Sequence, residues 1–465
     1  MRRCNLVSRK LLIALAGLAL PLLGSGVGAP SAQAQSINEA LGAAYANNPS
    51  INAARAELRS VDESVPQALS GWRPQIFGNV DVGSVSSNPN PGSSRYRNTA
   101  AIGLSVQQAL FRGFRTVNST RQAEAIVLAQ RESLRSTEQN VLFDAASAYM
   151  DVIRDTAIVS LRRSNIQFLN EQVRAARDRF EVGEGTRTDV SQAEARLADA
   201  QAELNLALAN VNTSRAVYRQ VIGADPKALS ARTDIYRHLP KNVDQAIRIG
   251  ADEHPAILSS LHLVDAAIFN VKATEGELLP TVTLEGNIER QWSPPGVSNL
   301  TSQDSASVFG RVSIPIYQGG SVSSRVREAK EDLGQAQVQV DVARDRIRAL
   351  VVSAWGQYEA AVASISAAEA SVSANQLALE GVIEEQRVGQ RTTLDVLDAQ
   401  FELVNSRVLL VSAQRDRAVA AYLLISSIGR LTADSIGLRV AVYKPSEHYD
   451  KVRNSWYGIR TPDGR

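Results

Sequence analysis

The sequence predicts a mainly helical fold in which long antiparallel helical hairpins are combined with four β-strands per chain. Landmark residues recur at one constant spacing, which indicates an internal duplication. Residues 114–182 contain neither Gly nor Pro, and as one helix they would reach ~100 Å at ~1.5 Å per residue. Four shorter runs alternate apolar and polar residues, which is typical of strands. Only 5% of residues are aromatic, which suits helices packed on small aliphatic side chains.

The N-terminal 34 residues are predicted to be a signal peptide. Arg2, Arg3, Arg9 and Lys10 precede a short apolar run, residues 11–23, and a small-residue cleavage site at Ala32-Gln-Ala34 follows. An uncleaved membrane anchor is the alternative, but spanning a bilayer takes ~20 residues. Cleavage removes the only cysteine, Cys4, and changes the formal charge from +2 to −2. The mature chain is therefore expected to have no disulfide and no affinity for nucleic acid.

The duplication has a spacing of 206 residues. The paired landmarks include Pro49 and Pro255, Pro74 and Pro280, Tyr149 and Trp355, Gly183 and Gly389, and Asp189 and Asp395. A constant offset means duplication with no net insertion. We therefore divide the chain into repeat 1 (residues 35–225), a linking segment (226–242), repeat 2 (243–430) and a C-terminal segment (431–465).

Each repeat has the same expected order of elements. A helical stretch (residues 37–71 and 243–278) is followed by two strands, a long helix (114–182 and 321–387), a sharp turn and a shorter helix (190–222 and 396–428). Helices this long need lateral neighbours, so the shorter helices are expected to lie end to end beside the long one. Gly334, Gly356 and Gly381 are potential interruptions of the second long helix.

The strands, residues 74–85, 98–110, 280–292 and 306–316, have one apolar and one polar face. In the third strand, Val282, Leu284 and Ile288 alternate with Thr283 and Glu285. Such alternation over ~10 residues is the signature of a transmembrane β-barrel strand, and a soluble sheet with one buried face is the alternative. Four strands cannot close a barrel, and a membrane does not tolerate open edges. A membrane-spanning sheet therefore requires a homo-oligomer.

The two turns have related sequences, Phe180-Glu-Val-Gly-Glu-Gly-Thr-Arg-Thr-Asp-Val190 and Arg387-Val-Gly-Gln-Arg-Thr-Thr-Leu-Asp-Val-Leu-Asp398. Glycine supplies the backbone freedom of a tight turn. Thr186 with Asp189, and Thr392 with Asp395, have the spacing of a capping box for the next helix.

The duplication, the paired tip segments and the order of elements resemble the TolC family of outer-membrane efflux and type I secretion channel proteins. The resemblance covers residues 36–430. It implies a homotrimer with a 12-stranded transmembrane β-barrel in the outer-membrane lipid and a helical tunnel that crosses the periplasm. It also implies a periplasmic adaptor protein and an inner-membrane transporter as partners. Drugs and secreted proteins both remain open as cargo.

The resemblance assigns roles to residues of the second tip. Asp395 and Asp398 match inward-facing carboxylates at the pore constriction, where rings of acids favour cations. Arg391 matches an arginine that holds the closed end together through Thr188 and Asp189. The family's latch also uses a tyrosine, and here Gln386 stands at that position. The alternatives without a gating role are that Asp189 and Asp395 only cap helices and that Arg391 is a solvated surface charge.

The resemblance also implies that the adaptor docks on the two tips, at Val182, Gly183, Val388 and Gly389. No catalytic, cofactor or metal site is expected, since the four histidines are not spaced as metal ligands and no phosphate-binding loop is present. The alternative function is an adaptor-like periplasmic coiled-coil protein. Such a protein would have one hairpin with compact β domains, whereas this sequence predicts two hairpins and four strands.

Overall fold

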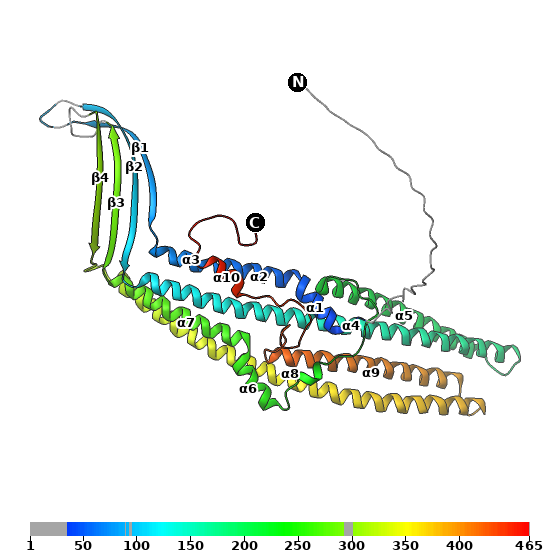
Figure 1. The fold of residues 1–465 in the computed structure, drawn as a ribbon. Coiled ribbons are helices and arrows are strands. Elements are labelled where there is room, and N and C mark those ends of the chain that lie inside the picture. The colour runs from blue at the N-terminus through cyan, green and yellow to red at the C-terminus, as the bar shows by residue number, and fades with distance from the viewer. Residues whose placement is uncertain (1–34, 89, 93–94, 293–300, 465) are drawn as a thin grey trace, which may run out of the picture.

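The computed structural model describes residues 35–88, 90–92, 95–292 and 301–464; the expected signal peptide lies outside this range. The described chain is built around two helical hairpins and one four-stranded sheet, with shorter helices packed along the hairpins (Figure 1). The sheet extends from one end of the helices, and both hairpin tips lie at the opposite end. The predicted fold class is confirmed.

The elements occur in the same order in both halves. Repeat 1 contains α1 (Ile37–Asn47), α2 (Pro49–Asp62), α3 (Ser64–Leu69), the 3-10 helix η1 (Ser70–Trp72), β1 (Gln75–Ser87), β2 (Arg95–Arg112), α4 (Arg115–Glu181) and α5 (Arg187–Ile222). After η2 (Ile235–His238), repeat 2 contains α6 (Val243–Glu253), α7 (Pro255–Glu275), η3 (Gly276–Leu278), β3 (Thr281–Trp292), β4 (Ser302–Ser313), α8 (Ser321–Arg387) and α9 (Thr393–Ser427). A last helix, α10 (Ser446–Val452), belongs to the C-terminal segment.

The two long helices, α4 and α8, have 67 residues each. Along α4 lie α2 and α5, and along α8 lie α7 and α9, as expected (Figure 1). Helix α8 runs without a break through Gly334, Gly356 and Gly381. Each glycine costs about 1 kcal/mol relative to alanine, and packing against α7 and α9 offsets that cost.

The first helical stretch of each repeat is not one helix. It is divided at Asn48 and at His254, which have extended backbones and directly precede Pro49 and Pro255. Proline disfavours a helical conformation in the residue before it, and it suits the first position of a new helix. Together α6 and α7 are long and apolar enough in composition to cross a membrane. They are nevertheless broken at His254, and α7 packs between α4 and α8.

The sheet has the antiparallel order β1-β2-β3-β4, and its register repeats the duplication. Ile76 lies opposite Val106 in the first strand pair, and Val282 lies opposite Val312 in the second. Both members of the second pair are 206 residues further along the chain. Within the described residues, β1 and β4 each pair on one side only, so the sheet has two open edges.

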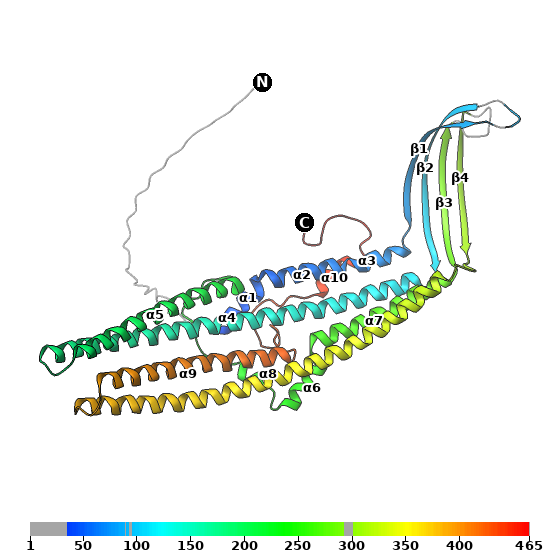
Figure 2. The same cartoon turned by 180° about the vertical axis from the view of Figure 1, so that it is seen from behind.

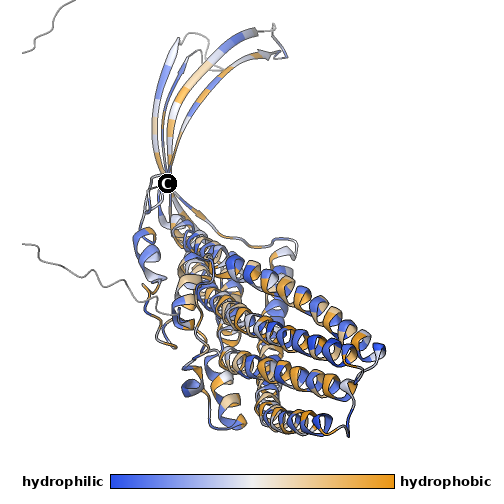
Figure 3. Ribbon diagram, turned by 90° about the vertical axis from the view of Figure 1, so that its right-hand side faces the viewer, coloured by the Kyte–Doolittle hydropathy of each residue, from blue (hydrophilic) through white to orange (hydrophobic). Residues whose placement is uncertain are grey.

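One face of the sheet is apolar and exposed. Val80, Ile102, Ile288 and Val308 share it, and they are 71%, 50%, 66% and 73% exposed. Figure 3 shows apolar and polar residues alternating along the strands, and Figures 1 and 2 show the sheet projecting away from the helices. The alternative of a soluble sheet buried under its own helices is therefore wrong.

The main hydrophobic core lies at the middle of the helical part, which we call the waist. It joins α1, α4, α9, the 226–242 link and the start of the C-terminal segment. The hydroxyl of Tyr149 lies 2.7 Å from the backbone oxygen of Gln35 and 2.8 Å from that of Ser230, and its single proton can donate to either of them. Leu431 and Leu438 are buried there, and the chain then leaves the waist to form α10.

Candidate functional site at the hairpin tips

The two hairpins turn through the same backbone conformation. Gly183 and Gly389 both have φ +79°, a value that side-chain-bearing residues rarely adopt. The amide of Gly183 donates to the oxygen of Phe180, and the amide of Gly389 donates to that of Gln386, at 3.1 and 3.0 Å. A side chain at either glycine would meet open space, so backbone conformation is what requires glycine. The duplicated sequence therefore forms duplicated turns.

A valine projects into solvent beside each turn glycine. Val182 and Val388 are both 72% exposed. With Gly183 and Gly389 they form two matching apolar patches, one on each hairpin tip, at the end of the molecule opposite the sheet. The structure thus places all four residues of the expected docking surface at the tips.

Both predicted capping boxes are present. The Asp189 amide donates to Thr186 Oγ1 at 3.2 Å, and Asp189 Oδ2 accepts from the Thr186 amide at 2.9 Å. Thr392 and Asp395 make the same two contacts at 3.3 and 2.8 Å. The hydroxyls of Thr186 and Thr392 also donate to these carboxylates, at 2.6 and 2.8 Å. The hydroxyl and amide donors hold the pKa of both aspartates below the usual value, so each carboxylate is charged at neutral pH. Capping is thus a role that both carboxylates fulfil within the chain.

Arg391 bonds within its own tip. Its Nε donates to Glu385 Oε2 at 2.8 Å, and within the described chain its hydrogen bond and ion pair are to Glu385 and not to Thr188 or Asp189. Gln386, at the position of the family's tyrosine, donates through Nε2 to Thr393 Oγ1 at 3.2 Å. Gln386 therefore ties α8 to the start of α9, within one hairpin.

Asp398 pairs with a residue that sequence reasoning missed. Arg196 of α5 donates to Asp398 Oδ1 of α9 at 2.6 Å, and its guanidinium lies 5.7 Å from the centre of the Phe401 ring. Both partners are partly exposed. The carboxylate expected to face the pore thus also joins the second hairpin to the first. No pattern in a single sequence reveals this pair, since it depends on how far the two hairpins slide along each other.

Buried contacts adjoin that pair. Leu397 is 1% exposed and packs with Leu169, Val173 and Ala200 of the first hairpin. Gln400 Nε2 donates to Asn165 Oδ1 at 3.0 Å, and both side chains are buried. Leaving either amide unpaired would cost about 1–3 kcal/mol, so this contact fixes the relative position of α9 and α4.

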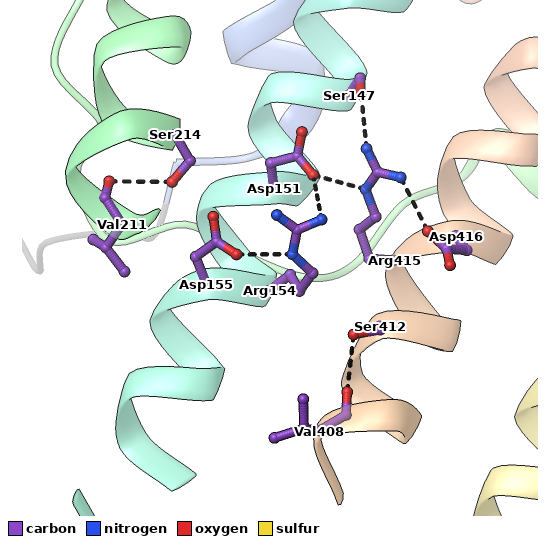
Figure 4. A network of polar contacts seen from close by, with 10 residues as sticks. All are labelled: Ser147, Asp151, Arg154, Asp155, Val211, Ser214, Val408, Ser412, Arg415 and Asp416. Atoms are coloured by element: carbon purple, nitrogen blue, oxygen red, sulfur yellow. Dashed lines mark hydrogen bonds and ion pairs between the residues drawn. The ribbon is translucent and has the colours of Figure 1, made fainter. Parts of the chain in front are cut away.

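A second polar network ties the hairpins together nearer the waist (Figure 4). Arg415 of α9 donates to Asp151 at 2.8 Å and to Ser147 at 3.1 Å, both on α4. Asp151 also pairs with Arg154, which bonds to the buried Asp155. Together with the contacts of Leu397, Asp398 and Gln400, this network packs the two hairpins of one chain into a single unit.

Among the described residues, no group of three or more His, Asp or Glu side chains is arranged to hold a metal ion. The features that do stand out are an exposed apolar sheet face, long helices and duplicated tips. They define the class of an outer-membrane channel protein whose helices extend away from the membrane.

The family follows from comparison with known sequences. The family model described as "Outer membrane efflux protein" matches residues 40–224 and 249–430. The chain belongs to this family, and it is therefore an outer-membrane efflux channel protein of the Gram-negative cell envelope, not an enzyme. The predicted family, localisation and class of function are confirmed.

Several relatives match most of the chain. The outer membrane efflux protein BepC of Brucella suis biovar 1 is 47% identical over 97% of this chain and 98% of its own length. The outer membrane protein TolC of Escherichia coli is 25% identical over 94% of this chain and 90% of its own length. The alkaline protease secretion protein AprF of Pseudomonas aeruginosa is 26% identical over 68% of this chain and 67% of its own.

Solved structures share the fold. The CmeC outer membrane channel of Campylobacter jejuni superposes with a TM-score of 0.75 at 16% identity, over 90% of this chain and 89% of that one. CusC gives a TM-score of 0.74 at 17% identity, over 84% of this chain and 91% of that one. At these identities the similarity shows the fold alone.

Proposed function

We propose that three copies of this chain form one passive exit duct across the outer membrane and the periplasm. The carrying observation is the four-stranded sheet, which has two open edges and an apolar face exposed to its surroundings. Unpaired backbone groups at an edge have no partners in lipid, so the edges must pair with other copies. Three sheets of four strands give a closed 12-stranded barrel, within the range of outer-membrane barrels.

The same face argues against the adaptor-like alternative. This face is largely apolar, and the ion pair that it carries among the described residues, Arg290 with Asp304, lies toward the loop end. A soluble periplasmic protein would expose the apolar side chains to water, whereas a lipid environment covers them.

The gate of the duct lies at the tips and, in this proposal, opens between subunits. Contacts at Asp398, Gln400 and Arg415 hold the two hairpins of one chain together. Arg391 is half exposed at the end of its hairpin, so its guanidinium could bond to a neighbouring copy that packs against the tip. In the closed state, the Arg391 side chain would leave Glu385 and bond to Thr188 and Asp189 of that copy. This contact would hold the closed state, since charge-assisted hydrogen bonds are stronger than neutral ones.

Asp395 and Asp398 would supply the charge of the constriction. Three copies place each carboxylate in a ring, and such rings attract cations and disfavour anions. Because Arg196 pairs with Asp398, the ring at Asp395 would contribute more of the net field. Val182, Gly183, Val388 and Gly389 would receive a periplasmic adaptor, which in turn connects the duct to an inner-membrane transporter.

The relatives suggest two classes of cargo. The relative TtgC of Pseudomonas putida is named for toluene efflux and AprF for alkaline protease secretion. We propose that the chain serves one or both of these cargo classes, small toxic compounds and secreted proteins. A deletion strain compared with its parent for drug sensitivity and for secreted proteins distinguishes them.

Conductance in planar bilayers tests the duct and its latch. The purified protein should form channels, and Arg391→Ser should raise the conductance because it removes the latch. Arg344→Ser is the matched control, since Arg344 is an exposed arginine of α8 with a local acidic partner, Asp341. An unchanged Arg391→Ser channel would exclude Arg391 from the latch, and absence of any channel would reject the duct.

A further inference from the structure

The C-terminal segment is held on the outside of two helices rather than hanging free. His448 of α10 contacts Asp62 of α2 at 2.9 Å, and Asp62 is completely buried. Tyr449 and Arg453 both bond to Glu124 of α4, at 3.2 and 3.1 Å. Figure 2 shows α10 lying against α2, on the side of the waist that leads to the sheet. These contacts direct the residues after α10 toward the end of the sheet that adjoins the helices.

Arg73 holds the end of that path. Its Nη1 donates to the backbone oxygen of Ser455 at 2.5 Å, and its guanidinium lies 5.1 Å from the centre of the Trp456 ring. Arg73 stands between η1 and the first residue of β1, Gln75. Trp456 is therefore fixed where the helical part ends and the sheet begins.

The residues held there are apolar and uncovered. Trp456 is 66% exposed, and Tyr457 and Ile459 are almost completely exposed. The exposed apolar face of the sheet starts three residues after Arg73, at Ile76. The tail thus brings exposed apolar side chains to the end of the sheet at which its apolar face begins.

Aromatic residues also mark both ends of the sheet. Trp292 and Tyr96 are exposed near the loop end, and Trp72 and Tyr317 are exposed near the helical end. Transmembrane barrels carry such aromatic girdles at both membrane interfaces, where amphipathic rings sit among the headgroups. Trp456 lies at the level of the inner girdle.

We propose that the C-terminal segment is a membrane-interface anchor, in which Trp456, Tyr457 and Ile459 insert into the phospholipid headgroup region of the periplasmic leaflet. The exposed Arg460 follows them and suits a lipid phosphate, which a guanidinium binds well. Helix α10 contacts both α2 and α4. Trp456 lies beside the start of the edge strand β1, where another copy would pair, so contact with that copy is the competing outcome that the experiment must exclude. The inference rests on the outer-membrane location and not on the proposed gate.

Tryptophan fluorescence tests the anchor. The chain has four tryptophans, so replacing Trp72, Trp292 and Trp355 by Phe leaves Trp456 as the only emitter. The full-length protein is reconstituted into phosphatidylethanolamine–phosphatidylglycerol vesicles with phospholipids brominated near the headgroup. We expect strong quenching by the brominated lipid and little by aqueous iodide. A variant that keeps only Trp355, which packs at the waist, should show no quenching by brominated lipid.

Two results would overturn the anchor. Quenching by iodide alone would place Trp456 in water, and protection from both quenchers would place it against protein, such as a second copy. If the triple variant does not fold, the difference in lipid quenching between the natural chain and Trp456→Phe gives the same answer. Conductance measured on the same preparation separates this outcome from failure of the duct, because channels without lipid quenching reject only the anchor.

Discussion

At the scale of single residues, His254 caps a helix with an imidazole. Its Nδ1 accepts a hydrogen bond from the amide of Ala256 at 3.1 Å, which requires that nitrogen to be unprotonated. Burial, and secondarily the positive charge of Arg135, lowers the pKa of His254 from 6.5 to about 4. The equivalent residue of repeat 1, Asn48, caps α2 through its side-chain oxygen at 2.8 Å and does not titrate in this range. The two repeats therefore differ in acid sensitivity at one equivalent cap.

The chain should consequently lose stability in acid at His254. Since its pKa is lower in the folded state, the unfolded state binds more protons between pH 6.5 and 4, and stability falls as pH falls through that range. The loss should approach about 3 kcal/mol per chain. His254→Asn copies the cap of repeat 1 and should flatten this part of the profile. Thermal unfolding in detergent at pH 7 and pH 4.5 measures it, and parallel profiles for the two proteins would contradict the assignment.

At the scale of elements, the contacts that matter most are those between helices of different hairpins. The pair of Arg196 and Asp398 is partly exposed, so it should contribute at most about 1 kcal/mol. The buried amide pair of Gln400 and Asn165 lies close by on the same two hairpins. The ion pair therefore adjusts the local opening of α9, while the buried contacts fix its position.

Reversing the charge of Arg196 should loosen the start of α9. Arg196→Glu replaces attraction to Asp398 by repulsion, and amides 396–401 should exchange hydrogen up to about fivefold faster. The double swap Arg196→Glu with Asp398→Arg should restore protection. Arg177→Glu is the control, because Arg177 pairs with Glu194 inside the first hairpin. Equal effects of the two single substitutions, measured by exchange mass spectrometry, would show that the coupling between hairpins is absent.

At the scale of the whole molecule, the duplication specifies how copies should meet. Leu104 of β2 lies opposite Ile288 of β3, and this is the seam between the repeats. The residue of repeat 2 that is equivalent to Leu104 is Gly310 of β4, and the residue of repeat 1 that is equivalent to Ile288 is Val82 of β1. Both lie on the open edge strands of the sheet. The seam between subunits should therefore place Val82 of one copy opposite Gly310 of the next.

Engineered cysteines can detect that register. The mature chain is expected to have no cysteine, so Val82→Cys with Gly310→Cys introduces the only pair. Oxidation should join three chains into one covalent ring, seen as a trimer on a non-reducing gel. Val82→Cys with Val308→Cys displaces the partner by two residues, roughly 7 Å, and should link poorly. Efficient linking of the displaced pair, or none of either pair, would contradict the register.

The features that could be predicted from sequence are those set by local chemistry. The tip glycines, the boxes at Thr186 and Thr392 and the strand faces all follow from neighbouring residues. The breaks at Asn48 and His254 were also encoded locally, by the prolines that follow. The pairing of Asp398 with Arg196 and the position of α10 could not be predicted from sequence. Both depend on contacts between segments hundreds of residues apart, whose relative position only the packed molecule determines.

The equal lengths of α4 and α8 restrict how a gene of this kind can change. Losing two turns from one long helix would leave its tip roughly 10 Å short of the other. In the proposed duct, an adaptor protein docked on both tips would then meet an uneven rim. Shortening or lengthening that preserves docking must remove or add the same number of residues in both halves, so length variation between related chains should come in matched pairs.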